Sequence, residues 1–213
     1  MARGLLVVCE GIDGSGKTTV SKGLAEALAA RGHPARWTFE PSHGYIGEAV
    51  RRSFREDTPE LSQAFLFMAD HVAHIREVER LLEEGYIVVS DRWSDSTFAY
   101  QGAALQESFA KQGLDAMRWL MDVEKVFDRA PDLTLLFDLP PTEAMRRIQT
   151  TRKELVKFER AEFLEIVRAN YLKLARERPH YRILDASRRV DESVMHALAL
   201  VEGALRRESA APS

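Results

Sequence analysis

The chain has 213 residues, of which 45% are hydrophobic and 30% are charged, a composition typical of a globular protein with one domain. Its formal net charge of −3 argues against a general nucleic-acid binder, which would carry a strong basic excess. The apolar runs are too short for a signal peptide or a membrane span, so we expect neither. A single cysteine, Cys9, excludes an intrachain disulfide and fits the reducing cytoplasm.

Strands and helices alternate along the predicted chain. Continuous apolar runs predict strands, and apolar residues at helical spacing predict helices. Strands of this kind indicate a parallel sheet covered by helices on both faces, within one domain over residues 1–207 and a disordered tail over 208–213. The expected strands cover residues 5–9, 35–39, 86–90, 133–137 and 181–184; the expected helices cover 17–31, 46–54, 61–82, 96–127 with a break near 112–113, 142–148, 159–177 and 192–206.

Polar residues stand at the end of each predicted strand. In a parallel α/β sheet the ligand lies beyond the carboxyl ends of the strands. We therefore expect the functional site at this edge of the sheet. The residues concerned are Glu10, Glu40, Pro41, Asp91, Arg92, Asp138 and Asp185.

Residues 11–18 match the pattern G-x-x-x-x-G-K-[ST] between a predicted strand and a predicted helix. Glycines in such a P-loop let successive backbone N–H groups point at phosphate oxygens, and the helix N-terminus adds positive partial charge. Lys17 would reach the β- and γ-phosphates of ATP, and the Thr18 hydroxyl would coordinate Mg²⁺. The predicted ATP-binding residues here are Gly11, Ile12, Asp13, Gly14, Ser15, Gly16, Lys17, Thr18 and Thr19.

Two features bear on the kind of phosphate chemistry. No Asn-Lys-x-Asp guanine-reading motif is present, which argues against a GTPase. The basic segment over residues 146–157 suits the lid of a small-molecule kinase, which needs cations around the transferred group and a cover that excludes water. Taken alone, the same charges are more typical of a solvated helix surface, but their place between the fourth predicted strand and the long helix after it favours the lid.

Further motifs make the chain similar to the thymidylate kinase family over residues 6–194. Residues 10–19 resemble that family's P-loop, and residues 91–102, Asp-Arg-Trp-Ser-Asp-Ser-Thr-Phe-Ala-Tyr-Gln-Gly, resemble its most specific signature. Residues 131–141 and 158–171 resemble its fourth strand and the helix after its lid. The resemblance implies a P-loop fold of the nucleoside monophosphate kinase type, with a short basic lid at about 147–157. It also implies Mg²⁺-dependent transfer of the γ-phosphate of ATP to dTMP, by a homodimer paired through the helix over 61–82.

The resemblance also implies roles for individual residues. Phe67 would stack on thymine, although an apolar residue of an amphipathic helix can equally belong to the core. Arg92 would bind the acceptor phosphate, with a plain ion pair to Asp91 as the alternative, and Asp91 would lie near Mg²⁺. Tyr100 would exclude a ribose 2′ hydroxyl. The remaining implied positions are Asp13, Glu40, Pro41, Ser96, Thr97 and Glu159 on the acceptor side, and Asp185 and Ala186 against adenine.

Two positions depart from the pattern in ways that affect mechanism and specificity. Gly14 stands where one branch of the family has a catalytic arginine, so the resemblance implies a lid cation: Arg152 first, then Arg147 or Lys153. His71 replaces an arginine that binds the thymine carbonyl, and imidazole has a shorter reach. This leaves two alternatives to a dTMP kinase: a kinase for another deoxynucleoside monophosphate or for several, and a non-catalytic ATP-binding sensor.

Overall fold

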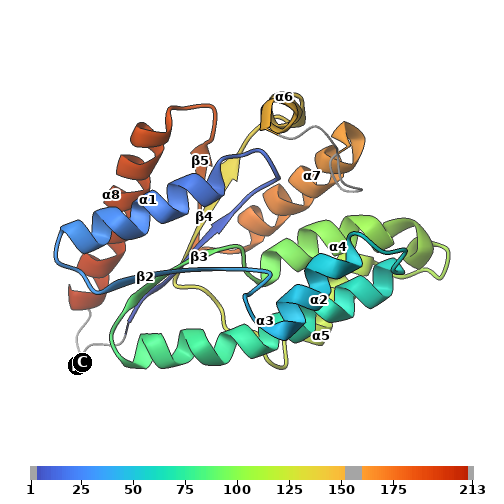
Figure 1. Cartoon of the computed structure of the whole chain (residues 1–213), viewed down its shortest axis with the longest axis horizontal. Helices are drawn as coiled ribbons and strands as arrows, with labels where there is room; N and C mark the ends of the chain where they lie inside the picture. The colour runs from blue at the N-terminus through green and yellow to red at the C-terminus, as the bar shows by residue number, and fades with distance from the viewer. Residues whose placement is uncertain (1–3, 152–159, 211–213) are drawn as a thin grey trace.

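The computed structural model describes residues 4–151 and 160–210 and shows one α/β domain (Figure 1). A five-stranded sheet in the order β2-β3-β1-β4-β5 is parallel throughout. The strands are β1 (Leu6–Glu10), β2 (Ala35–Phe39), β3 (Ile87–Asp91), β4 (Leu133–Asp138) and β5 (Tyr181–Asp185). The helices are α1 (Lys17–Ala30), α2 (Tyr45–Ser53), α3 (Glu60–Glu83), α4 (Ser94–Ala110), α5 (Ala116–Glu124), α6 (Pro141–Thr151), α7 (Ala161–Glu177) and α8 (Val190–Ala210).

The sheet order places the site. β1 lies at the centre, with β3 on one side and β4 on the other. After β1, the chain adds β2 and β3 on one side of β1 and then β4 and β5 on the other side. The turn after β1 therefore lies at the topological switch point, where α/β sheets bind ligands. Cys9 of β1 is in register with Asp91 of β3, which brings the P-loop and the residues after β3 to one edge.

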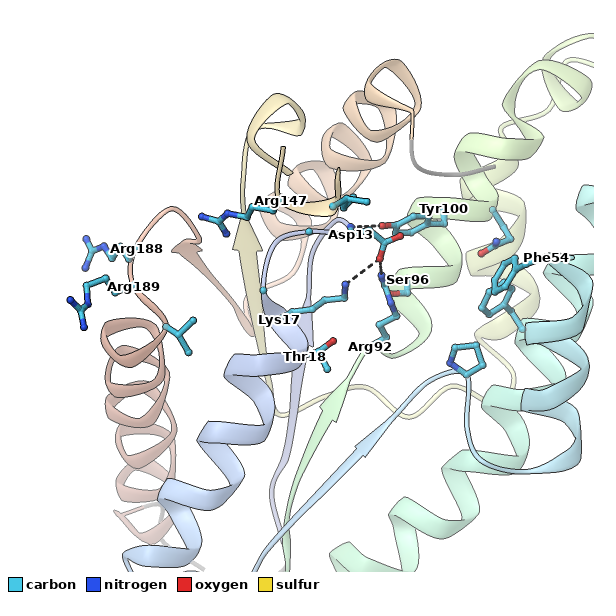
Figure 2. A pocket seen from close by; sticks show the side chains of 17 residues that line it. Asp13, Lys17, Thr18, Phe54, Arg92, Ser96, Tyr100, Arg147, Arg188 and Arg189 are labelled. Carbon is cyan, nitrogen blue, oxygen red and sulfur yellow. Dashed lines mark hydrogen bonds and ion pairs between the residues drawn. The ribbon is translucent and has the colours of Figure 1, made fainter. Parts of the chain in front are cut away.

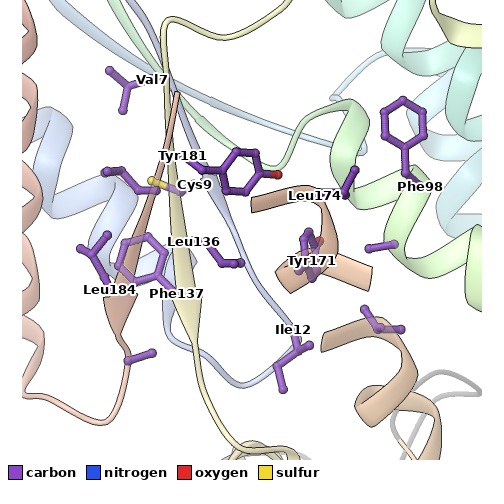
Figure 3. Packing of buried hydrophobic residues seen from close by; sticks show 14 of the residues in the cluster. Val7, Cys9, Ile12, Phe98, Leu136, Phe137, Tyr171, Leu174, Tyr181 and Leu184 are labelled. Carbon is purple, nitrogen blue, oxygen red and sulfur yellow. The ribbon is translucent and has the colours of Figure 1, made fainter. Parts of the chain in front are cut away.

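Helices cover both faces of the sheet. α1 and α8 pack together on one face, while α3, α4, α5 and α7 lie on the other (Figure 1). The apolar strands fill the space between, and Figure 3 shows Leu136 of β4 pointing toward Tyr171 of α7. Cys9 is fully buried, and burial raises the pKa of its thiol well above the ordinary value, so it is an inert core residue.

The fold class expected from the sequence is confirmed. Four of the five strands end one residue later than expected, so Glu10, Asp91, Asp138 and Asp185 close their strands. The break expected near 112–113 in the helical region over 96–127 is confirmed: α4 and α5 are separated by a turn with Gly113 at a φ of 72°. The last helix continues to Ala210 and so includes the first three residues of the expected tail. Within the described residues, no helix is long and apolar enough to span a membrane.

Candidate active site

The P-loop connects β1 to α1 and packs tightly against α6. Gly16 precedes the first residue of α1 in the left-handed conformation that glycine adopts without strain. Gly14 has a φ of 81°, and a Cβ atom built there would lie 2.6 Å from the backbone oxygen of Ala144. Neither the conformation nor the space admits a side chain. An arginine at position 14 is therefore incompatible with this loop, which favours a catalytic cation from another element.

Cations and a carboxylate meet at the centre of the site (Figure 2). The guanidinium of Arg92 donates to Asp13 Oδ1, and Lys17 Nζ lies 3.5 Å from the same oxygen. The Tyr100 hydroxyl accepts a 2.8 Å hydrogen bond from the backbone N–H of Asp13. Although burial opposes ionisation, Arg92 and Lys17 lower the pKa of Asp13 to about 2. Asp13 is therefore ionised and orients both cations.

Thr18 and Asp91 form the part of the site that suits a metal ion. The Thr18 hydroxyl donates to Asp91 Oδ2, while Asp91 Oδ1 is buried and makes no hydrogen bond within the described residues. An orphaned carboxylate oxygen beside a hydroxyl fits Mg²⁺, which prefers oxygen ligands and often completes its shell with substrate phosphates and water. In residues 4–151 and 160–210 no three His, Cys, Asp or Glu side chains group into a metal cluster, so phosphate would have to supply further ligands.

An elongated cavity of about 810 Å³ contains this centre. Arg188 and Arg189, on the loop before α8, mark one end, and Phe54 marks the other, with the P-loop cluster between them (Figure 2). At the second end, the rings of Phe54 and Phe67 lie 5.8 Å apart at 52°. The volume lies within the range of small-molecule sites, and the cavity offers an arginine-bordered end and an apolar end on either side of the phosphate loop.

Eleven of the 24 residues predicted for the site line this cavity. They come from the P-loop, the loop after β2, α3, the segment after β3, α4 and α6. These predicted lining residues are Asp13, Gly14, Gly16, Lys17, Thr18, Pro41, Phe67, Arg92, Ser96, Tyr100 and Arg147.

Other predicted residues lie elsewhere. Asp91 accepts a hydrogen bond from the Thr18 hydroxyl but does not line the cavity. Four P-loop positions are also absent from the cavity wall: Gly11, Ile12, Ser15 and Thr19. Thr97 is buried, and Thr97, Asp185 and Ala186 do not line the cavity. Arg152, Lys153 and Glu159 lie outside the described residues.

Arg147 links α6 to the loop after β5. Its guanidinium donates 3.0 Å to the backbone oxygen of Ala186 and 3.2 Å to the carboxylate of Glu143. The side chain thus lines the cavity while it holds the loop expected to face adenine. Positioning of that loop is a role that the sequence did not suggest for this residue.

His71 and Glu40 are not in the cavity wall. His71 is fully buried, with Nδ1 2.7 Å from Glu40 and Nε2 3.2 Å from Asp128, and its ring packs edge-on against Trp93. Burial opposes protonation, but Glu40 and Asp128 raise the pKa of His71 well above its ordinary value. Burial alone would raise the pKa of Glu40, but His71 and His74 outweigh this effect and lower the pKa to about 2. Both ring nitrogens of His71 are therefore engaged by protein carboxylates and do not contact a bound base in this conformation.

Several cavity residues were missed by the sequence analysis. Gln101 belongs to the quoted 91–102 signature and follows Tyr100 on α4, so the motif contained a usable signal. Arg188 and Arg189 follow the predicted adenine loop directly. Phe54 had no sequence signal, because an aromatic residue just after a short amphipathic helix is indistinguishable from a core residue.

Comparisons with known proteins agree with this geometry. A family model described as thymidylate kinase matches residues 9–197. A probable thymidylate kinase of Methanococcoides burtonii is 40% identical over 93% of this chain and 98% of its own length. Proteins of the same description from Methanosarcina acetivorans and Natronomonas pharaonis are 44% and 41% identical, over 87% and 95% of this chain and 89% and 100% of their own lengths. Because both the family model and these relatives cover most of its length, the chain belongs to the thymidylate kinase family.

Proposed function

We propose that this chain transfers the γ-phosphate of ATP to dTMP, forming ADP and dTDP, as a step in dTTP synthesis. The observation that carries the proposal is that a P-loop and Arg92 lie within one cavity, between an arginine-bordered end and an aromatic end. Family membership supplies the substrates, and the cavity has room for a donor and an acceptor nucleotide to meet at the P-loop.

The acceptor would occupy the end lined by Pro41, Phe54 and Phe67. Phe67 offers a ring face for thymine, and the Gln101 amide can donate to and accept from a pyrimidine edge. Arg92 would bind the acceptor phosphate through its forked donors, replacing part of its contact with Asp13. Tyr100, held by the Asp13 N–H, would lie beneath the sugar and exclude a 2′ hydroxyl.

The donor would bind with its phosphates on the P-loop and its base toward Arg188. Thr18 and Asp91 would hold Mg²⁺, which neutralises charge on the β- and γ-phosphates. Lys17 and Arg92 reach the space between donor and acceptor and stabilise the charge of the transferred group. A phosphate monoester is already an anionic nucleophile, so the chemistry needs positioning and charge neutralisation rather than a general base. Arg147, Arg152 and Lys153 are the proposed lid cations.

A coupled assay of ADP production with ATP and Mg²⁺ tests this function. We expect turnover with dTMP, loss of turnover in Lys17→Ala, and strong discrimination against UMP relative to dUMP, because Tyr100 leaves no room for the extra hydroxyl. ATP binding without acceptor-dependent ADP would instead identify a nucleotide sensor and would contradict the proposal.

The buried position of His71 favours a second candidate, a kinase with a broader range of deoxynucleoside monophosphates. Since His71 is engaged by Glu40 and Asp128, no cation at this position reads the base carbonyl. The same assay with dUMP, dCMP and dGMP separates the two: a strong preference for dTMP favours the first candidate, and comparable turnover favours the second.

We further propose that the protein is a cytoplasmic homodimer. Leu61, Phe65 and Val72 of α3 are 39%, 50% and 37% exposed, and Phe65 packs edge-on against Trp119 of α5. An exposed apolar stripe of this kind suits a second copy of the chain. Sedimentation velocity would measure the oligomeric state. The lone buried Cys9 suits a reducing compartment.

A further inference from the structure

The backbone of Arg92 adopts a conformation that needs support. Its φ is 77°, and among residues 4–151 and 160–210 no other non-glycine residue has a positive φ. A residue with a Cβ is strained in this region and stays there only when its surroundings hold it. The Arg92 N–H donates 3.0 Å to the Cys9 oxygen, and the Ser90 hydroxyl donates 2.6 Å to the Arg92 oxygen. These contacts hold the backbone N–H and the backbone carbonyl of Arg92.

Besides Asp13, which binds the guanidinium directly, Glu10 supports both the backbone after Arg92 and its guanidinium. Its Oε1 accepts a 2.9 Å hydrogen bond from the backbone N–H of Trp93, the residue directly after Arg92. Its Oε2 accepts from the hydroxyls of Ser96 and Tyr171, at 2.7 and 2.9 Å. Those two hydroxyls lie 2.9 and 3.4 Å from Arg92 Nη1. One carboxyl group therefore holds the strained backbone through one oxygen and the guanidinium through the other.

Glu10 itself is out of reach of substrate. It is fully buried and does not line the cavity, and Tyr171, one of its partners, is a core residue of α7 (Figure 3). Burial and the nearby Asp95 raise the pKa of Glu10 to about 7, against the lowering influence of Arg92 and the two hydroxyls. A buried carboxyl with so high a pKa opposes folding when ionised, so its packing alone does not account for its presence.

We propose that Glu10 is a positioning residue that aims the Arg92 guanidinium at the phosphate of the acceptor nucleotide. The inference rests on the proposed function and adds to it a residue that touches no reacting atom. It predicts a specific pattern: loss of Glu10 weakens binding of the acceptor phosphate and leaves binding of the acceptor base and sugar intact.

The test compares dTMP with thymidine, which shares the base and sugar but lacks the phosphate. Calorimetry would measure Kd for both ligands in the wild type and in Glu10→Gln, which keeps the shape but loses the charge and one acceptor. We expect the Kd for dTMP to rise about five- to tenfold and the Kd for thymidine to stay unchanged. The KM for ATP should also be unchanged. Tyr171→Phe, which removes one of the linked hydroxyls, should show a smaller change in the same direction.

Glu124→Gln is the matched control, because Glu124 is equally buried but its carboxylate oxygens make no hydrogen bond within the described residues, and so none to Trp93, Ser96 or Tyr171. It should bind both ligands like the wild type. A parallel loss of dTMP and thymidine affinity in Glu10→Gln would show a purely structural role and overturn the inference, as would unchanged dTMP affinity. A wild-type protein that does not bind dTMP would overturn the proposed function and this inference with it, so the two failures are distinguishable.

Discussion

The raised pKa of Glu10 predicts that part of the folding stability depends on pH. In the unfolded chain this carboxyl titrates near its ordinary value of 4.5, and in the fold near 7. The folded state therefore holds a proton that the unfolded state releases. The stability that this group contributes is fully present below pH 4.5 and is lost as the pH rises from 4.5 through about 7. Glu10→Gln, which cannot ionise, should remove this dependence.

The magnitude follows from the two pKa values. With a pKa of 4.5 in the unfolded state and about 7 in the folded state, Glu10 makes the free energy of unfolding about 2.5 kcal/mol lower at about pH 8 than at about pH 5. Because Glu10 is fully buried, solvent screening does not reduce this figure. For a chain of this length, the corresponding change in Tm is roughly 5 to 10 °C.

Urea denaturation of the wild type and of Glu10→Gln at both pH values measures the effect. Other groups contribute to the pH dependence of each protein, so the quantity of interest is the difference between the two. We expect Glu10→Gln to gain about 2.5 kcal/mol relative to the wild type on going from about pH 5 to about pH 8. A difference between the proteins that does not change with pH would refute the argument, since it would mean that Glu10 titrates alike in both states.

Three other changes test separate parts of the structure. Gly14→Ala should lower stability by more than about 1 kcal/mol in thermal unfolding, because its Cβ would meet the Ala144 oxygen at 2.6 Å; wild-type stability would contradict the close packing of the P-loop on α6. Phe67→Ala should raise the KM for dTMP about tenfold or more and spare the KM for ATP in steady-state assays; equal changes in both would place Phe67 in the core instead. Phe65→Asp should shift the proposed dimer toward monomer in sedimentation velocity, and an unchanged dimer would exclude this face of α3 as the interface.

The local elements and the phosphate loop were determined by the sequence itself. The five strands were identified to within about one residue: β1, β3 and β4 are buried and therefore apolar along their length, whereas the edge strands β2 and β5 also carry exposed residues. The glycines and Lys17 identify the P-loop, because the phosphate cradle requires those residues at that spacing. The 91–102 signature likewise located Arg92, Ser96 and Tyr100, all of which line the cavity.

Only the tertiary structure decided which partner each polar side chain takes. Glu10 appeared as one of several strand-end acids, and its link to Arg92 depends on Ser96 and Tyr171, which lie far from it along the chain. His71 appeared as a base-reading substitute, yet Glu40 and Asp128 converge on it from two other segments. Periodicity and motifs record local geometry, whereas the strand order and these hydrogen bonds depend on contacts between distant segments. The reaction class could therefore be inferred from the sequence, and the residues that hold its cations in place could not.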